Sequence, residues 1–153
     1  MTNPLRCVVD ASVSIKQFIP DPLSAKVKQL FRHLNQPDTE FFVPDLFYIE
    51  SANIIWKYVR AGQYSITDVP QDLANLKSLS LRVVSTANLM EEAVMIGLSY
   101  GITAYDAAYV TLSARVNAPL LTVDQKLLNA LSSTSFDVRS FINFSIPPLP
   151  NAD

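Results

Sequence analysis

The sequence contains one cysteine, Cys7, and one histidine, His33, among its 153 residues. This scarcity excludes a disulfide framework and any zinc site built from cysteine and histidine ligands. No stretch approaches the roughly 18 uninterrupted apolar residues that a membrane span requires. The first residues also lack the apolar segment and small-residue cleavage site of a signal peptide. We therefore expect a cytoplasmic protein that does not bind membranes.

Glycine and net charge are also low, with three glycines and a formal net charge of −2. The sequence has no glycine-rich loop with a lysine, which argues against a phosphate cradle for nucleotide hydrolysis. A charge this close to zero gives no general basic field for nucleic acid. Hydrophobic residues nevertheless make up 49% of the chain, enough for the buried core of one domain.

Short apolar runs alternate with segments of helical periodicity along most of the chain. The expected strands cover residues 6–10, 40–43, 81–84 and 119–123, with a weaker fifth strand at 137–141. The expected helices run to about residue 19 and over 23–34, 46–61, 68–79, 88–100, 103–116 and 124–131. This order predicts an α/β fold of three α/β/α layers, Rossmann-like, with a central and mostly parallel sheet. We expect one domain over residues 1–145 and a flexible, proline-rich tail over 146–153.

Several residues are typical of helix ends. Gly62 and Gly101 follow helical segments and are expected to stop them. Asn88 with Glu91 has the spacing of a capping box, as does Thr103 three residues before the next acid. His33 lies late in an amphipathic helix, and we expect it at the surface.

Three aspartates stand where strands end or helices begin. Asp10 and Asp124 each follow a buried-looking strand, and Asp106 lies in the first turn of a helix. In a parallel sheet the carboxyl ends of the strands form the edge where ligands bind. Helix capping explains each of these acids equally well when it is taken alone.

Glu50 is more informative because it lies inside a helix that is apolar on nearly every side. Buried glutamates are rare unless they are paired or bind metal, although a solvated face or an ion pair to Lys57 would also explain this one. If all four acids share one pocket, their repulsion requires a cation. Ligands that are all oxygens favour Mg²⁺ or Mn²⁺.

Four segments, in this order, resemble the VapC-type toxins of the PIN-domain family. They are Val8-Val-Asp-Ala-Ser-Val13, Pro44-Asp-Leu-Phe-Tyr-Ile-Glu50, Thr103-Ala-Tyr-Asp-Ala-Ala-Tyr109 and Leu120-Leu-Thr-Val-Asp124. The resemblance extends over residues 8–138. It implies a PIN fold, an Mg²⁺- or Mn²⁺-dependent endoribonuclease that acts on RNA, a homodimer, and a cognate antitoxin whose tail enters the active-site groove.

The same resemblance assigns roles to residues. It implies that Asp10, Glu50, Asp106 and Asp124 bind the metal and are catalytic, and that Ser12 holds a carboxylate or a water. An ordinary serine at a helix start explains Ser12 equally well.

Weaker candidates and other functions stay open at this stage. Lys16, Arg115 and Lys126 are candidates for contacts with RNA phosphates, and Trp56 is expected in the core or at an interface. The alternative function is a non-catalytic RNA- or protein-binding module on the same fold. Aspartyl phosphatases normally carry a second aspartate two residues after the first, where this chain has Ser12. Phosphorylation receivers need an acidic pair after the first strand, where this chain has only Asp10. Both functions therefore fit less well.

Overall fold

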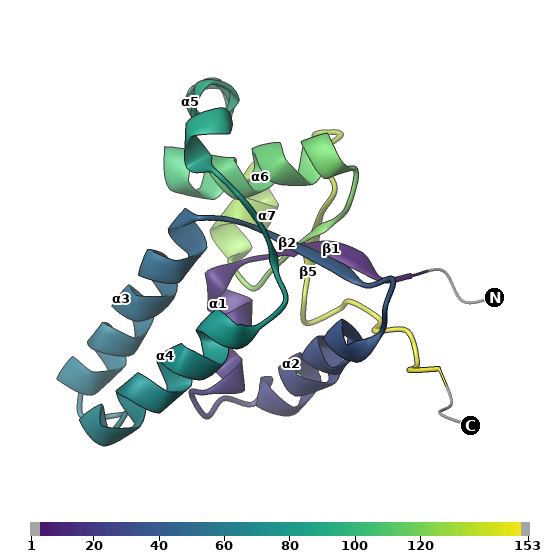
Figure 1. Ribbon diagram of the computed structural model, residues 1–153. Helices are drawn as coiled ribbons and strands as arrows, with labels where there is room; N and C mark the ends of the chain where they lie inside the picture. The colour runs from purple at the N-terminus through teal and green to yellow at the C-terminus, as the bar shows by residue number, and fades with distance from the viewer. Residues whose placement is uncertain (1–3, 151–153) are drawn as a thin grey trace.

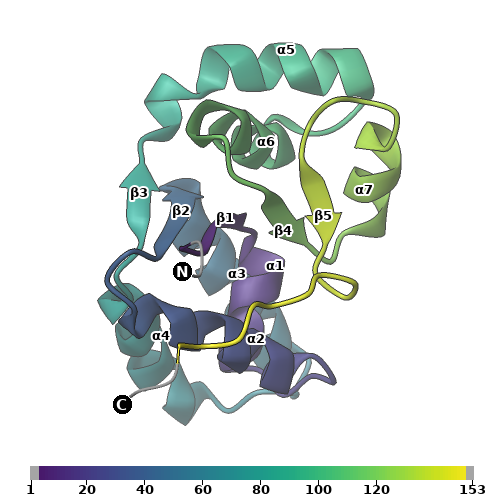
Figure 2. The same cartoon turned by 90° about the vertical axis from the view of Figure 1, so that its right-hand side faces the viewer.

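The computed structural model describes residues 4–150 and contains a five-stranded sheet in the order β3-β2-β1-β4-β5. Each neighbouring pair of strands is parallel, and helices cover both faces (Figures 1 and 2). The strands are β1 (Arg6–Val9), β2 (Glu40–Pro44), β3 (Arg82–Val84), β4 (Leu120–Thr122) and β5 (Val138–Ser140). The predicted three-layer α/β fold is confirmed, and the weak fifth strand is present.

The helices connect the strands and divide between the two sides of the sheet, with α1 to α4 on one side and α5 to α7 on the other (Figures 1 and 2). They are α1 (Ala11–Ser14), α2 (Ser24–Phe31), α3 (Leu46–Arg60), α4 (Val69–Ser78), α5 (Met90–Tyr100), α6 (Ala104–Val116) and α7 (Gln125–Leu131). None of these helices, within residues 4–150, combines the length and the apolar character needed to cross a membrane.

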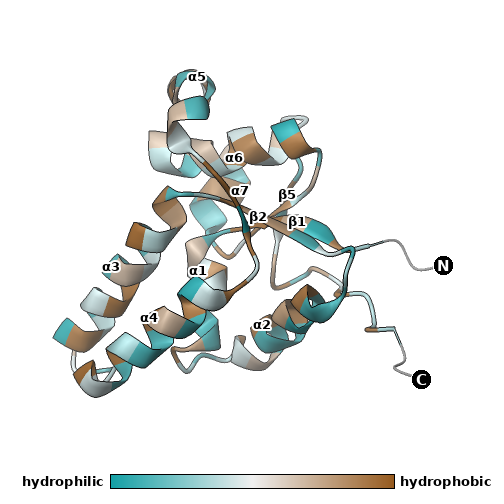
Figure 3. Ribbon diagram, in the orientation of Figure 1, coloured by the Kyte–Doolittle hydropathy of each residue, from teal (hydrophilic) through white to brown (hydrophobic). Residues whose placement is uncertain are grey.

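Alternate side chains of the central strand enter two different cores, as the period of two in a strand requires. Cys7 and Val9 pack with α2, whereas Val8 packs with α6 and α7. All three side chains are fully buried. A strand covered on both faces needs apolar residues at every position, which explains the continuous apolar run in the sequence. The helices α2 and α4, by contrast, carry both hydrophobic and hydrophilic residues, as their mixed colours in Figure 3 show.

The predicted helix ends are partly confirmed. Gly62 and Gly101 have φ values of 71° and 70°, the left-handed conformation that glycine adopts without strain. Thr103 accepts the Asp106 N–H at 3.1 Å, as its capping role predicts. The predicted capping box at Asn88 is wrong, because residues 86–88 form a short 3₁₀ turn and α5 begins only at Met90.

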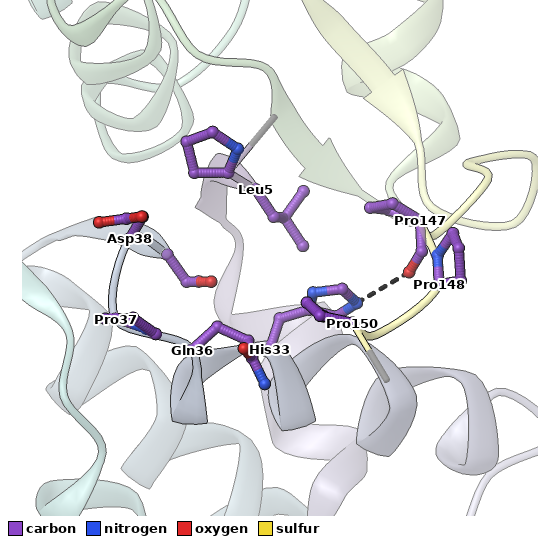
Figure 4. A pocket seen from close by; sticks show the side chains of 10 residues that line it. Leu5, His33, Gln36, Pro37, Asp38, Pro147, Pro148 and Pro150 are labelled. Carbon is purple, nitrogen blue, oxygen red and sulfur yellow. Dashed lines mark hydrogen bonds between the residues drawn. The ribbon is translucent and has the colours of Figure 1, made fainter. Parts of the chain in front are cut away.

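The prediction of a surface position for His33 is also wrong. After α2 the chain tightens into a 3₁₀ turn (Arg32–Asn35), and His33 is only 4% exposed. Its Nε2–H donates to the carbonyl oxygen of Pro147 at 2.9 Å, beside a small cavity of about 160 Å³ (Figure 4). A histidine on a helix that looks amphipathic became buried because a distant segment of the chain covers it.

That covering segment is the beginning of the proline-rich tail. Ile146 packs against the core on the α2 side, and the Pro147 carbonyl contacts His33. The predicted flexible tail therefore begins with residues that contact the domain, while residues 151–153 lie outside the described part. The boundary at residue 145 stays a prediction.

Candidate metal centre

Two of the predicted acids follow neighbouring strands at the carboxyl edge of the sheet. Asp10 comes directly after β1, and Asp124 lies two residues beyond the end of β4. The two strands are paired through Val9 and Leu121, and the Asp10 N–H donates to the Leu121 carbonyl at 3.2 Å. The pairing of these strands therefore brings together two acids that are distant in the sequence.

Thr122 links the same two acids directly. Its hydroxyl donates to Asp10 Oδ2 at 2.8 Å and accepts the backbone N–H of Asp124 at 3.0 Å. The residue is fully buried. Sequence reasoning did not assign Thr122 a role; the available signal was a hydroxyl residue two positions before an acid at a strand end.

The capping explanation also holds for both aspartates. Asp10 accepts the Ser12 N–H at 3.3 Å, and Asp124 accepts the N–H groups of Lys126 and Leu127 at 3.0 and 3.2 Å. Capping uses one oxygen of each side chain, Oδ1 in both cases. A capping role is thus compatible with a second role for the same carboxylate.

Glu50 reaches the site from α3 and is half-buried. Its Oε1 accepts a hydrogen bond of 2.6 Å from the Tyr109 hydroxyl of α6. Among the residues that the structure describes, no ion pair joins Glu50 to Lys57, which removes that explanation for the acid. Sequence reasoning missed Tyr109, because its apolar ring gave no sign of where its hydroxyl lies.

All four acids line one cavity of about 230 Å³. The lining residues are Asp10, Ala11, Ser12, Glu50, Asn53, Ile54, Lys57, Asp106 and Asp124. They come from the ends of β1 and β4 and from α1, α3 and α6. The structure thus brings every predicted site residue, including Ser12, to one cavity at the edge of the sheet.

Burial and mutual repulsion raise the pKa of three of these acids. Burial raises the pKa of Asp10, although the hydrogen bonds from Thr122 and Ser12 oppose the shift. Burial, followed by the charges of Asp10 and Asp124, raises the pKa of Asp106. Burial, followed by the charges of Asp10 and Asp106, raises the pKa of Glu50 from 4.5 to about 7, although the Tyr109 hydrogen bond opposes the shift. The metal-free fold therefore loses stability as the pH rises from 4.5 towards 7, because the unfolded chain releases this proton first.

Burial and the nearby carboxylates also raise the pKa of Tyr109 far above its usual value of 10. Its hydroxyl consequently keeps its proton at any physiological pH. Tyr109 therefore remains able to donate a hydrogen bond to Glu50 whenever that carboxyl is ionised.

The donor set suits a hard divalent cation, because four carboxylates and a hydroxyl offer oxygen alone. The Ser12 hydroxyl is buried and has no hydrogen-bond partner among residues 4–150, so it remains available to a ligand or to a water. Within the same residues, no three acidic, histidine or cysteine side chains are yet close enough to hold an ion. A cation would have to draw the oxygens together against their repulsion.

The weaker candidates lie elsewhere or are engaged. Lys16 pairs with Asp21 at 3.8 Å, and Arg115 pairs with Glu92 at 2.8 Å. Trp56 is 54% exposed, so it does not belong to the core. It lines an apolar hollow next to the acid cavity, and Glu50 and Asn53 line both.

Comparison with known proteins identifies the class of this domain. The chain matches the PIN-domain family model over residues 7–131, and it therefore belongs to the PIN-domain family. Within the family it is similar to the VapC-type ribonucleases. It is 34% identical to Ribonuclease VapC3 of Pyrobaculum aerophilum over 125 residues, which cover 80% of this chain and 92% of that relative. The VapC-type resemblance seen in the sequence is confirmed.

Two solved structures share the fold. PAE2754 from Pyrobaculum aerophilum has a TM-score of 0.66 at 22% identity, with 90% of this chain and 85% of that chain covered. A toxin–antitoxin complex from Klebsiella pneumoniae has a TM-score of 0.57 at 12% identity, with 88% and 97% covered. At these identities the comparison supports the architecture alone.

Proposed function

We propose that this chain is a metal-dependent endoribonuclease of the VapC type, the toxin of a toxin–antitoxin pair. The observation that carries the proposal is the convergence of Asp10, Glu50, Asp106 and Asp124 on one cavity at the carboxyl edge of the sheet. RNA as the substrate rests on the similarity to Ribonuclease VapC3.

In this proposal the four acids hold Mg²⁺ or Mn²⁺. The bound cation would neutralise charge on the phosphodiester and lower the pKa of an attacking water. Asp10 is held in place by Thr122, and Asp124 by the N-terminal amides of α7. Hydrogen bonds hold these side chains in place before RNA binds. The entropy cost of orienting them is therefore already met in the folded protein and does not add to the barrier of the reaction.

The decisive test removes the metal. Protein stripped with EDTA should not cleave a labelled single-stranded RNA, and added Mg²⁺ or Mn²⁺ should restore cleavage. The proton on Glu50, whose pKa is about 7, competes with the cation. The Mg²⁺ concentration for half-maximal cleavage should therefore fall as the pH rises from 6 to 8.

A Glu91→Gln variant is the control, because this exposed acid lies on α5 and does not line the cavity. It should show the wild-type metal and pH dependence. Cleavage that persists in EDTA would contradict a metal-dependent enzyme. Absence of metal binding altogether would instead favour the non-catalytic module.

We further propose that the chain forms a homodimer and that a cognate antitoxin is its protein partner. We also propose a cytoplasmic location, because the RNA substrate is found there. The support for a dimer is an apolar face on α5 that is exposed among residues 4–150. Met90, Val94 and Leu98 recur every four residues along one side of that helix, and Leu98 is 76% exposed.

Light scattering of the purified chain tests the dimer. Twice the mass of the 17.0 kDa chain is expected, and a Leu98→Lys variant should return the mass of one chain. A Ser99→Lys variant on the same helix is the matched control and should stay dimeric. A single-chain mass for the wild type at all concentrations would exclude the dimer.

A further inference from the structure

Glu50 is held by the hydroxyl of a tyrosine from another helix, whereas the other three acids have different contacts. Asp10 and Asp124 are held by a threonine and by backbone amides, and the Asp106 backbone is fixed by its cap. Glu50 lies within α3, where no helix cap can hold it, and its side chain has three rotatable bonds. Among residues 4–150, the hydrogen bond to the Glu50 carboxylate comes from the Tyr109 hydroxyl.

The side chain of Tyr109 is held rigidly by the core around it. It lies on α6 one turn after Asp106, and its side chain is 2% exposed among residues of the large core. A ring packed in this way has little freedom to move, so its hydroxyl presents a donor at a constant position. The distance of 2.6 Å to Glu50 Oε1 is in the range of strong hydrogen bonds to a charged oxygen.

The hydrogen bond engages only one of the two carboxylate oxygens of Glu50. Oε1 accepts the hydrogen bond from Tyr109, whereas Oε2 has no hydrogen-bond partner among the described residues. Because Glu50 lines the acid cavity, Oε2 is available to a cation there. Outer hydrogen bonds of this kind orient metal-binding carboxylates, and their loss typically weakens metal affinity about 10- to 100-fold.

We propose that Tyr109 is a positioning residue that holds Glu50 toward the cavity and thereby sets the affinity of the site for a divalent cation. The proposal rests on the proposed function, since it requires that the four acids bind metal. It adds a residue that touches neither the cation nor the RNA.

Tyr109→Phe tests the proposal because it removes one oxygen and keeps the buried ring. Mn²⁺ binding to metal-free protein, followed by electron paramagnetic resonance without RNA, measures the affinity independently of cleavage. The dissociation constant should rise about 10- to 100-fold. The variant should still melt cooperatively by circular dichroism.

Tyr64→Phe is the matched control. The Tyr64 hydroxyl is also buried, but it has no hydrogen-bond partner among residues 4–150 and does not line the acid cavity. Its removal should leave Mn²⁺ affinity within about twofold of wild type.

A double-mutant cycle separates positioning from a general structural role. In a Glu50→Ala background the Tyr109→Phe change should have no further effect on Mn²⁺ affinity, because the residue that it positions is gone. An equal loss in both backgrounds would overturn the proposal, as would unchanged affinity in Tyr109→Phe alone. If wild-type protein binds no Mn²⁺, both the proposed function and this proposal fail. If the wild type binds Mn²⁺ and Tyr109→Phe binds it equally well, only this proposal fails, so the two failures are distinguishable.

Discussion

Asp10→Asn should lower RNA cleavage by at least about 100-fold while the protein stays folded, because a metal site stabilises the transition state by several kcal/mol. Asparagine has the shape of aspartate but lacks its charge. Its side-chain oxygen can still accept the Ser12 N–H, since asparagine caps helices as well as aspartate does. The fold therefore keeps its cap while the cavity loses a charged ligand.

The measurement compares initial cleavage rates and thermal melting of the purified proteins in Mg²⁺. Asp137→Asn is the control: this exposed aspartate pairs with Arg139 beside β5 and does not line the cavity. The control should cleave at the wild-type rate. Wild-type cleavage by Asp10→Asn would refute the metal-dependent nuclease, whereas loss of folding would show that this charge is structural.

Phe41→Ala should reduce the free energy of unfolding by about 3–5 kcal/mol. Phe41 lies in β2, is fully buried, and packs edge-to-face on Phe31 of α2 at a centroid distance of 5.4 Å. Truncation to alanine opens a cavity between the sheet and α2. For a chain of this length the melting temperature should fall by roughly 6–20 °C.

Ile66→Ala is the comparison for this prediction. Ile66 is also a large apolar residue, but it is 72% exposed. Its truncation should change the free energy of unfolding by no more than about 0.5 kcal/mol. Similar losses in the two variants, measured by urea unfolding, would show that the α2 core is not packed as described.

The order of strands and helices could be predicted from the sequence because it depends on local patterns. Apolar runs define the strands, and residues such as Gly62 and Gly101 stop the helices wherever the chain lies in space. The predicted acids shared a cavity for a related reason: two of them end parallel strands, whose carboxyl ends meet at one edge.

The features that were missed depend on contacts between distant segments. Thr122 and Tyr109 look like ordinary strand and helix residues until β4 pairs with β1 and α6 packs near α3. His33 was misplaced for the same reason, since its burial depends on Pro147, more than 100 residues away in the chain. Local periodicity carries no information about such partners.

The pairing of β1 with β4 determines when the acid cavity can form during synthesis of the chain. Asp10 is synthesised before its partner strand, which ends at Thr122, and before the last acid, Asp124, so 112 residues of sequence separate Asp10 from Thr122. A nascent chain that stops short of β4 has neither the Thr122 contact nor the fourth carboxylate. The four-acid cavity therefore cannot be complete during translation until β4 and Asp124 have left the ribosome.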